Sequence, residues 1–287
     1  MKTIVRSCLC VLLFTVAACG GDKSNEPPVA RPTVTLNKDK AAIGSPLRIT
    51  YQFEVKADAA FDGDYIVFLH VIEPDGEKLW QDDHTPPVPT SQWKPGQTVE
   101  YTRTIFVPNY PYIGEANLRI GLYSPTHGGR LVLDAPEVSR REYLVGRITL
   151  LPQSENVFLI YNIKEGWHPA EVDPADPARE WQWTGKAATI SFANPRRDAT
   201  FYLEWDARTD LFDPPQQVIL KAGGETIGTF TADSRVPTLT TFPVTAAQFG
   251  TEDMAAITIE VDRTFSGTGN DPRELGLRVF HAFVEPK

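Results

Sequence analysis

The stretch L47-R-I-T-Y-Q-F-E-V55 alternates strictly between apolar and polar residues. Successive side chains of a β-strand point to opposite faces, so this period of two predicts a strand with one face in a core and the other in water. Residues 65–72 are more continuously apolar, as in a strand covered on both faces, and the turn sequence E73-P-D-G76 follows directly. The folded part of the chain therefore begins as β-structure.

The same signals recur on both sides of this stretch. Apolar or alternating runs between turn residues predict further strands at residues 33–36, 99–107, 116–123 and 130–133. No segment of this half has the spacing of an amphipathic helix. Short antiparallel strands of this kind predict an immunoglobulin-like β-sandwich over residues 33–147.

The strand pattern restarts near residue 148, so we expect a second domain over residues 148–287. One short helix is expected at residues 246–249, directly before Gly250. Eight expected strands suit a jelly roll. The fold class predicted is thus all-β, with two sandwiches in tandem. The strands of the second domain are expected at residues 157–163, 188–192, 200–207, 217–222, 226–231, 240–244, 256–262 and 275–284.

Three motifs of the second half carry a resemblance. They are G166-W-H-P-A-E171, W181-Q-W-T-G-K-A-A-T-I-S-F192 and R273-E-L-G-L-R-V-F-H-A-F-V-E285. Together they resemble a β-sandwich module of uncharacterised bacterial envelope proteins and of proteins beside glycan-handling machinery. Its layout is similar to that of galactose-binding-like jelly rolls. The resemblance covers roughly residues 157–285, and it implies no catalytic residues.

The N-terminus has the pattern of an export signal. Lys2 and Arg6 precede an apolar run of about ten residues, which is too short to span a bilayer. The run ends in V16-A-A-C-G20, which resembles the lipobox of bacterial lipoproteins. The resemblance implies that residues 1–18 are removed, that Cys19 carries the lipid, and that residues 19–32 form a polar, proline-rich tether. The alternative is an ordinary secretory signal in which Cys19 is incidental.

The composition limits which binding sites and which partners the mature protein could have. All three cysteines, Cys8, Cys10 and Cys19, lie at or before the expected cleavage point, so the mature chain would have no disulfide or thiol site. Cleavage would change the formal charge from −9 to −11, because Lys2 and Arg6 are lost. An acidic chain is a poor nucleic-acid binder. We expect the protein to contact the membrane through its lipid. Gly20 follows the cysteine, which favours the outer membrane by analogy with enteric lipoproteins.

The sequence favours a non-enzymatic protein. It has no Gly-x-Ser-x-Gly elbow, no His-Glu-x-x-His zinc motif and no glycine-rich phosphate loop, and no cofactor is expected. The five histidines are scattered, so none is tied by local sequence to a nucleophile. Paired carboxylates for glycoside hydrolysis stay open as an alternative, because such residues meet only in the fold.

The segment D82-D-H84 is the weak metal candidate. Asp82 and His84 suit a hard or borderline cation. Neighbouring residues of an extended chain alternate, so Asp82 and His84 share a face while Asp83 points away. We therefore favour a polar turn before a proline-rich connection pinned by buried Trp80 and Trp93.

A ligand site is expected in the loops of the second domain. A tryptophan face stacks on a sugar ring, and charged side chains then bind the hydroxyls. The candidate residues are Trp167, His168, Glu171, Arg179 and Trp181. The alternative for the tryptophans is that they plug the edge of the sandwich.

The function expected is therefore binding. The sequence favours a lipoprotein of the cell envelope, on the periplasmic or surface face of the outer membrane, with a cell-envelope or exported polysaccharide as the ligand. A docking subunit of an export or surface-assembly complex is the first alternative, and a glycan-active hydrolase is the second.

Overall fold

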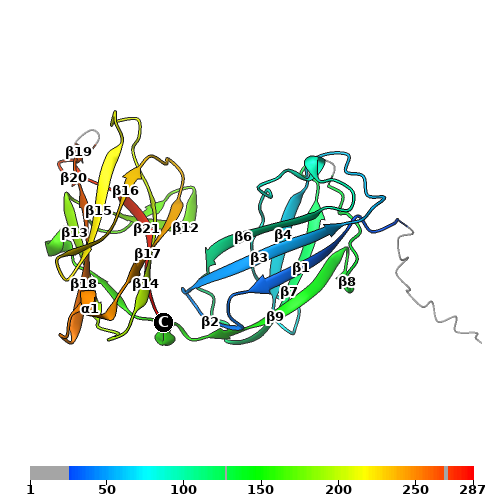
Figure 1. Cartoon of the computed structure of the whole chain (residues 1–287), viewed down its shortest axis with the longest axis horizontal. Coiled ribbons are helices and arrows are strands. Elements are labelled where there is room, and N and C mark those ends of the chain that lie inside the picture. Colours follow the sequence, from blue (N-terminus) through cyan, green and yellow to red (C-terminus); the bar gives the residue numbers. More distant parts are fainter. Residues whose placement is uncertain (1–25, 127, 268–270) are drawn as a thin grey trace, which may run out of the picture.

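The structure is a computed structural model that describes residues 26–126, 128–267 and 271–287. Two all-β units lie side by side along the long axis of the molecule (Figure 1). The expected signal peptide, Cys19 and most of the expected tether lie outside the described residues. Within those residues, no helix has the length and apolar character needed to span a bilayer.

The first unit is a sandwich of two sheets. The sheet orders match the immunoglobulin arrangement, and β2 pairs with β9 in parallel at one edge. One sheet contains β1 (Ala30–Leu36), β3 (Pro46–Val55) and β6 (Thr98–Phe106). The other contains, in order, β2 (Lys40–Ala42), β9 (Glu142–Leu151), β7 (Gly114–Tyr123), β4 (Ile66–Ile72) and β5 (Lys78–Gln81), and β8 (Glu137–Ser139) pairs with β9.

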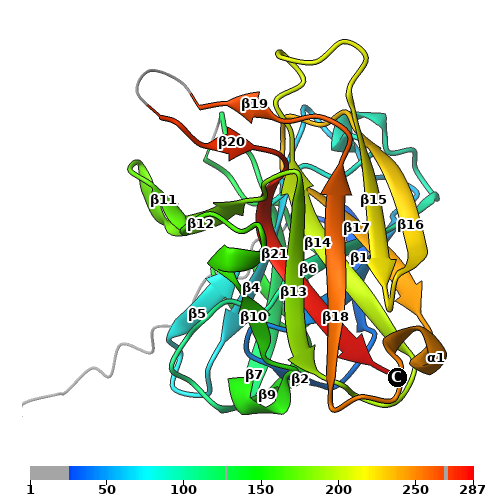
Figure 2. The same ribbon diagram turned by 90° about the vertical axis from the view of Figure 1, so that its left-hand side faces the viewer.

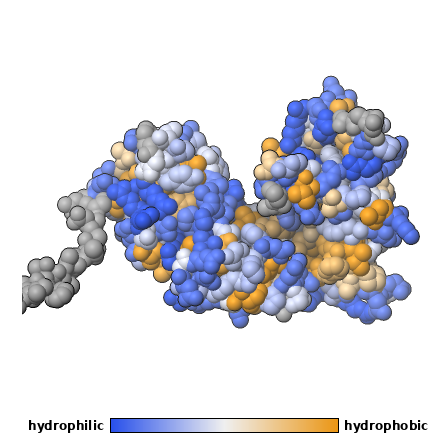
Figure 3. Space-filling model, turned by 180° about the vertical axis from the view of Figure 1, so that it is seen from behind, coloured by the Kyte–Doolittle hydropathy of each residue, from blue (hydrophilic) through white to orange (hydrophobic). Residues whose placement is uncertain are grey.

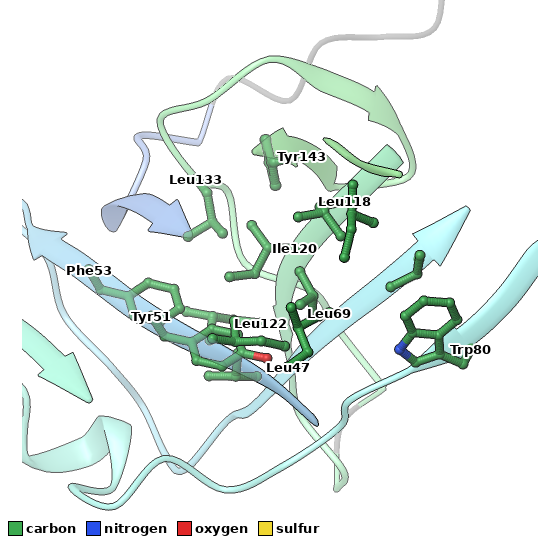
Figure 4. Close-up of a cluster of buried hydrophobic side chains, with 14 of the residues drawn as sticks. Leu47, Tyr51, Phe53, Leu69, Trp80, Leu118, Ile120, Leu122, Leu133 and Tyr143 are labelled. Carbon is green, nitrogen blue, oxygen red and sulfur yellow. The ribbon is translucent and has the colours of Figure 1, made fainter. Parts of the chain in front are cut away.

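The core of this unit follows from the alternation in β3. Its apolar residues are buried, whereas Arg48 and Glu54 are exposed. Opposite them lie Leu69 and Ile120 from the second sheet (Figure 4). Trp80 and Trp93 are buried in the same core, as the sequence predicted.

The second unit is a sandwich of two five-stranded sheets. Apart from the β15–β16 hairpin, its long strands alternate between the sheets, and the sheet orders are those of a jelly roll. Figure 2 shows β13 and β18 in front of β21 and β14, with the β11–β12 hairpin projecting to one side. One sheet contains β10 (Leu159–Tyr161), β13 (Ala187–Ala193), β18 (Met254–Val261), β15 (Gln216–Ala222) and β16 (Glu225–Ala232). The other contains β11 (Glu171–Asp173), β12 (Asp176–Trp183), β21 (Arg278–Pro286), β14 (Ala199–Asp206) and β17 (Thr238–Val244).

Short elements complete the fold. The expected helix is present as α1 (Ala246–Phe249), and Thr245 and Gln248 close a capping box at its start. Three 3₁₀ turns lie in connections, and one two-stranded ribbon flanks the second unit. They are η1 (Thr90–Gln92), η2 (Gln153–Glu155), η3 (Ile163–Glu165), β19 (Phe265–Ser266) and β20 (Glu274–Leu275).

Several boundaries differ from the expected ones. β1 begins at Ala30, inside the expected tether. β9 continues to Leu151, and its Ile148 and Leu150 belong to the first core, so the first unit ends four residues later than expected. Residues 130–133 form isolated bridges rather than a strand. β12 occupies a segment expected to be a loop, because Pro174 and Pro177 obscure its alternation.

The two units touch through a few side chains. The rings of Phe106 and His281 stack at 4.7 Å, and Lys38 Nζ lies 2.8 Å from Glu285 Oε1. A notch with apolar residues lies between the units (Figure 3). A cleft of about 520 Å³ at the junction is lined by residues of both units, including Ala42, Lys38, Phe283 and Glu285. The outer face of the sheet that contains β21 therefore faces the first unit at one end.

Candidate functional site

Asp82 and His84 form a buried polar cluster in the first unit. Both are buried and Asp83 is exposed, which confirms the predicted alternation. Asp82 accepts a hydrogen bond from the Tyr51 hydroxyl at 2.7 Å and two from the Arg103 guanidinium, each at 2.9 Å. His84 Nε2 lies 2.8 Å from the Tyr101 hydroxyl. We call these five residues, Tyr51, Asp82, His84, Tyr101 and Arg103, the Asp82 cluster.

The Asp82 cluster is best explained as structural. Burial alone would raise the pKa of Asp82, but hydrogen bonds from His84, Arg103 and Tyr51 outweigh it and hold that pKa well below its usual range. The carboxylate is thus ionised and fully engaged by protein donors. Among the described residues, no group of three or more histidine, cysteine or acidic side chains is arranged to hold a metal ion. This geometry does not favour the hypothesis that Asp82 and His84 bind a metal ion.

Trp167 is a core residue and not a platform. Its side chain is only 1% exposed, and its indole Nε1 donates to the Thr189 carbonyl at 2.8 Å. The ring packs edge-on against Tyr161 at 4.9 Å. Gly166 precedes it with φ +94°, where an added Cβ would lie 1.8 Å from the Ala187 carbonyl oxygen. This corrects the expected role of Trp167, because a ring with no exposed face cannot stack on a sugar.

His168 and Glu171 are tied to the chain segment before β21. His168 Nε2 donates to the Glu274 carbonyl at 2.9 Å. Glu171 lies in β11, where its Oε1 accepts from Arg273 at 2.6 Å. The Arg273 guanidinium also donates hydrogen bonds to the Asp271 carboxylate, and these bonds lower the pKa of Asp271 to about 2. Both expected ligand residues are partly exposed, but one polar side-chain atom of each already has a protein partner.

Arg179 and Trp181 do come together, and they do so on an outer sheet face. Both belong to β12, where residues two apart share a face, and both are partly buried. The Arg179 guanidinium lies 5.0 Å above the ring of Phe280 in β21, and the Trp181 and Phe280 rings meet edge-on at 6.3 Å. Phe280 was not predicted from the sequence.

Arg278 joins these rings into one surface. Its guanidinium lies 5.1 Å from the Trp181 ring, 5.5 Å from Trp183 and 5.2 Å from Phe280. Asp206, which is buried, accepts two hydrogen bonds from the same guanidinium and so fixes its position. We call Arg179, Trp181, Trp183, Arg278 and Phe280 the arginine–aromatic face.

The register explains why these residues meet. β12 and β21 are antiparallel neighbours, and Trp183 pairs with Arg278. The alternation then places Trp181 and Phe280 on the same side as that pair. The sequence contained the signal in R278-V-F-H281, where Arg278 and Phe280 alternate with buried Val279. This alternation alone does not predict the arginine–aromatic face, because the face also depends on the pairing of β21 with β12.

A different surface carries the largest exposed apolar side chains of the second unit. Phe158 is 79% exposed, and Ile160 and Ile163 are exposed beside it. They lie in and around β10, an edge strand that pairs only with β13. We call these three residues the β10 ridge.

Comparisons with known proteins supply no function. No family model matches the chain, and no curated protein matches it. The chain is similar to the native conformation of Escherichia coli α2-macroglobulin, at 12% identity and a TM-score of 0.25, covering 88% of this chain and 14% of that one. It also resembles the M60 catalytic domain with the CBM51-1 and CBM51-2 domains of Clostridium perfringens ZmpB, at 9% identity and a TM-score of 0.25, covering 92% and 38%.

The collagen adhesin of Staphylococcus aureus is a third such structure, at 7% identity and a TM-score of 0.19, covering 90% of this chain and 96% of that one. The chain thus spans well under half the length of the first two proteins. At these TM-scores the likeness carries no argument about this chain.

Proposed function

We propose that the protein is a non-catalytic lipoprotein of the cell envelope that binds carbohydrate at the arginine–aromatic face. Its lipid would be attached at Cys19 and would hold it to the outer membrane, on the periplasmic or surface side. The ligand class is a cell-envelope or exported polysaccharide. The proposal combines the lipobox resemblance of the N-terminus with the chemistry of this one surface.

The observation that carries the proposal is the close approach of two partly exposed aromatic residues, Trp181 and Phe280, to the guanidinium groups of Arg179 and Arg278. Trp181 and Phe280 lie on adjacent strands, and both residues are only partly buried. A flat apolar ring contacts the C–H face of a pyranose, and guanidinium N–H groups bind hydroxyl oxygens. Arg278 is already oriented by Asp206, so little side-chain entropy is lost when a ligand binds.

The carboxylates nearest to this face do not favour the hydrolase alternative. A glycosidase acid must be protonated at working pH, which requires a raised pKa. Asp206 is held by Arg278, and Glu171 and Asp271 are both held by Arg273. For Asp271 the hydrogen bonds from Arg273 lower the pKa, which is the opposite of what a glycosidase acid requires.

The docking alternative has one observation in its favour, the β10 ridge. Exposed apolar side chains on an open sheet edge are typical of surfaces that pair with another chain. The ridge and the arginine–aromatic face lie on different sheets, so the two functions make separable predictions.

A glycan array tests the proposal. The probe is the chain from residue 19 with Cys19→Ser, so that no lipid interferes. We expect retention of at least one polysaccharide class, and loss of that signal in Phe280→Ala at an unchanged melting temperature. A matched Phe158→Ala variant, changed on the β10 ridge, should bind as the wild type does. An array without any retained glycan, or retention that depends on Phe158, would overturn carbohydrate binding at this face.

A further inference from the structure

The turn between β8 and β9 has an unusual backbone. Arg140 and Arg141 are its central residues, with φ values of 41° and 61°. Positive φ at both central positions of a hairpin turn is normally supplied by glycine, asparagine or aspartate. Arginine carries a Cβ that crowds the backbone in this conformation. The turn therefore retains two arginines against a local conformational cost, which points to a role for their side chains.

These arginines line a hollow. An open depression of about 440 Å³ is lined, among the residues that the structure describes, by Gly128, Arg130, Arg140 and Arg141. Arg130 Nη1 donates to the Arg140 carbonyl and to Glu142 Oε1, each at 3.0 Å, which fixes the Arg130 guanidinium at the wall. The Arg140 side chain is exposed, and no carboxylate of the described residues lies within 4.0 Å of its guanidinium. We call this depression the Arg140 hollow.

The charges around the hollow differ from those of the chain as a whole. Arg119 also approaches Glu142, at 3.6 Å, so four arginines gather here with three glutamates, Glu26, Glu137 and Glu142. The cluster has a surplus of one positive charge in a chain of formal charge −9. The Glu26 side chain, which pairs with Arg141 at 2.8 Å, is 63% exposed. A surface ion pair of this kind contributes little to stability.

We propose that the Arg140 hollow binds a phosphate group. Planar guanidinium groups bind phosphate oxygens through paired, charge-assisted hydrogen bonds, and several arginines around one depression can share a single phosphate. Arg140 supplies donors that no carboxylate of the described residues engages, and Arg130 supplies a cation already held in position. The proposal does not depend on carbohydrate binding, because the hollow lies on the first unit and the arginine–aromatic face on the second.

The path of the chain favours a membrane source for the phosphate. Arg141 bonds Glu26, the first of the described residues. Cys19 precedes Glu26 by seven residues, and a chain of that length spans at most about 25 Å. If Cys19 carries the predicted lipid, the hollow must lie near the headgroups of the same membrane. This choice of source rests on the proposed lipid anchor, whereas phosphate binding itself does not.

The test compares two arginines that share the same backbone strain. Arg140→Asn keeps a residue that tolerates positive φ and removes the cation. Arg196→Asn is the matched control, because Arg196 has φ 52° and lies at a turn of the second unit, paired with Asp253. Each variant is made in the chain from residue 19 with Cys19→Ser. Binding is measured to vesicles of phosphatidylglycerol with phosphatidylcholine, to pure phosphatidylcholine vesicles and to inorganic phosphate.

We expect wild-type binding to the anionic vesicles and about fivefold weaker binding in Arg140→Asn, as for one arginine near an anionic surface. Both variants should melt at or above the wild-type temperature, since each relieves strain, and Arg196→Asn should bind as the wild type does. Binding of inorganic phosphate without vesicle binding would support the site and overturn the membrane source. Equal binding by Arg140→Asn and wild type, or no phosphate-bearing probe bound by the wild type, would overturn the site.

Discussion

The six tryptophans show how differently one residue type can be used. Trp167 and Trp181 are both candidates from the sequence, fourteen positions apart. Trp167 follows a left-handed glycine that turns it into the core, whereas Trp181 lies on the outer side of β12. Alternation within β12 predicts that Trp181 and Trp183 share a side. It does not tell which side faces the second sheet, because that depends on the pairing of β12 with β21.

Trp167→Ala should therefore destabilise the second unit without a direct effect on a ligand. Removal of a fully buried indole costs about 3–5 kcal/mol, from lost transfer free energy and the cavity left behind. Chemical denaturation measures this cost. The control is Trp181→Ala, which we expect to cost clearly less because Trp181 is only partly buried. Equal costs for the two variants would contradict the assignment of Trp167 to the core.

Asp82 should make stability fall in acid. Its folded-state pKa lies below the unfolded value of about 3.9, so in acid the unfolded chain binds more protons than the folded one. The stabilisation is complete above that unfolded value and is lost as the pH falls toward the folded-state pKa. Asp82→Asn should lower stability at pH 7 and flatten its decline below pH 4. Asp83→Asn, at the exposed neighbour, should keep the wild-type profile; an unchanged profile in Asp82→Asn would refute the linkage.

At the level of elements, periodicity predicted most long strands but missed two of them and several short ones. β3, β7, β14 and β18 alternate cleanly, so their existence follows from the sequence. β9 was divided by the expected domain boundary, β12 was masked by prolines, and β5 is only four residues long. The arginine–aromatic face lies on β12 and β21. The sequence predicted β21 but not β12, so only half of this face could be predicted.

The motif G166-W-H-P-A-E171 requires glycine at its first position, because the backbone there has positive φ and has no room for a Cβ. Gly166→Ala should cost several kcal/mol, because the added Cβ meets the Ala187 carbonyl in addition to the strain of positive φ. Gly224→Ala is the matched control, with φ +84° and open space around the Cβ, and should cost about 1–2 kcal/mol. Thermal melting of both variants measures the difference, and equal losses would remove the steric argument.

At the scale of the whole molecule, the sequence predicted two sandwiches but not their contact. The Phe106–His281 stack and the Lys38–Glu285 pair join residues that are 175 and 247 positions apart, respectively. Local sequence patterns do not predict contacts between residues so far apart. They position the outer face of the β21 sheet beside the first unit. Membrane attachment was predicted at the opposite end of the chain, at Cys19.

The anchor can be tested directly. Cys19→Ser should leave an unlipidated precursor, because serine cannot form the thioether to diacylglycerol. Metabolic labelling with a radioactive fatty acid measures the outcome in cells that express the full chain. Cys10→Ser, within the apolar run, is the control and should still be labelled. Continued labelling and normal maturation of Cys19→Ser would show that the protein is not a lipoprotein of this kind.

The central claim is that the arginine–aromatic face binds a polysaccharide, and affinity electrophoresis tests it most directly. The chain from residue 19 with Cys19→Ser migrates through native gels with and without the polysaccharide found on the array. We predict that the wild type and Phe158→Ser are retarded, that Trp181→Ala is not, and that all three melt within a few degrees of one another. Equal retardation of Trp181→Ala and wild type, or loss of retardation only in Phe158→Ser, would contradict the claim.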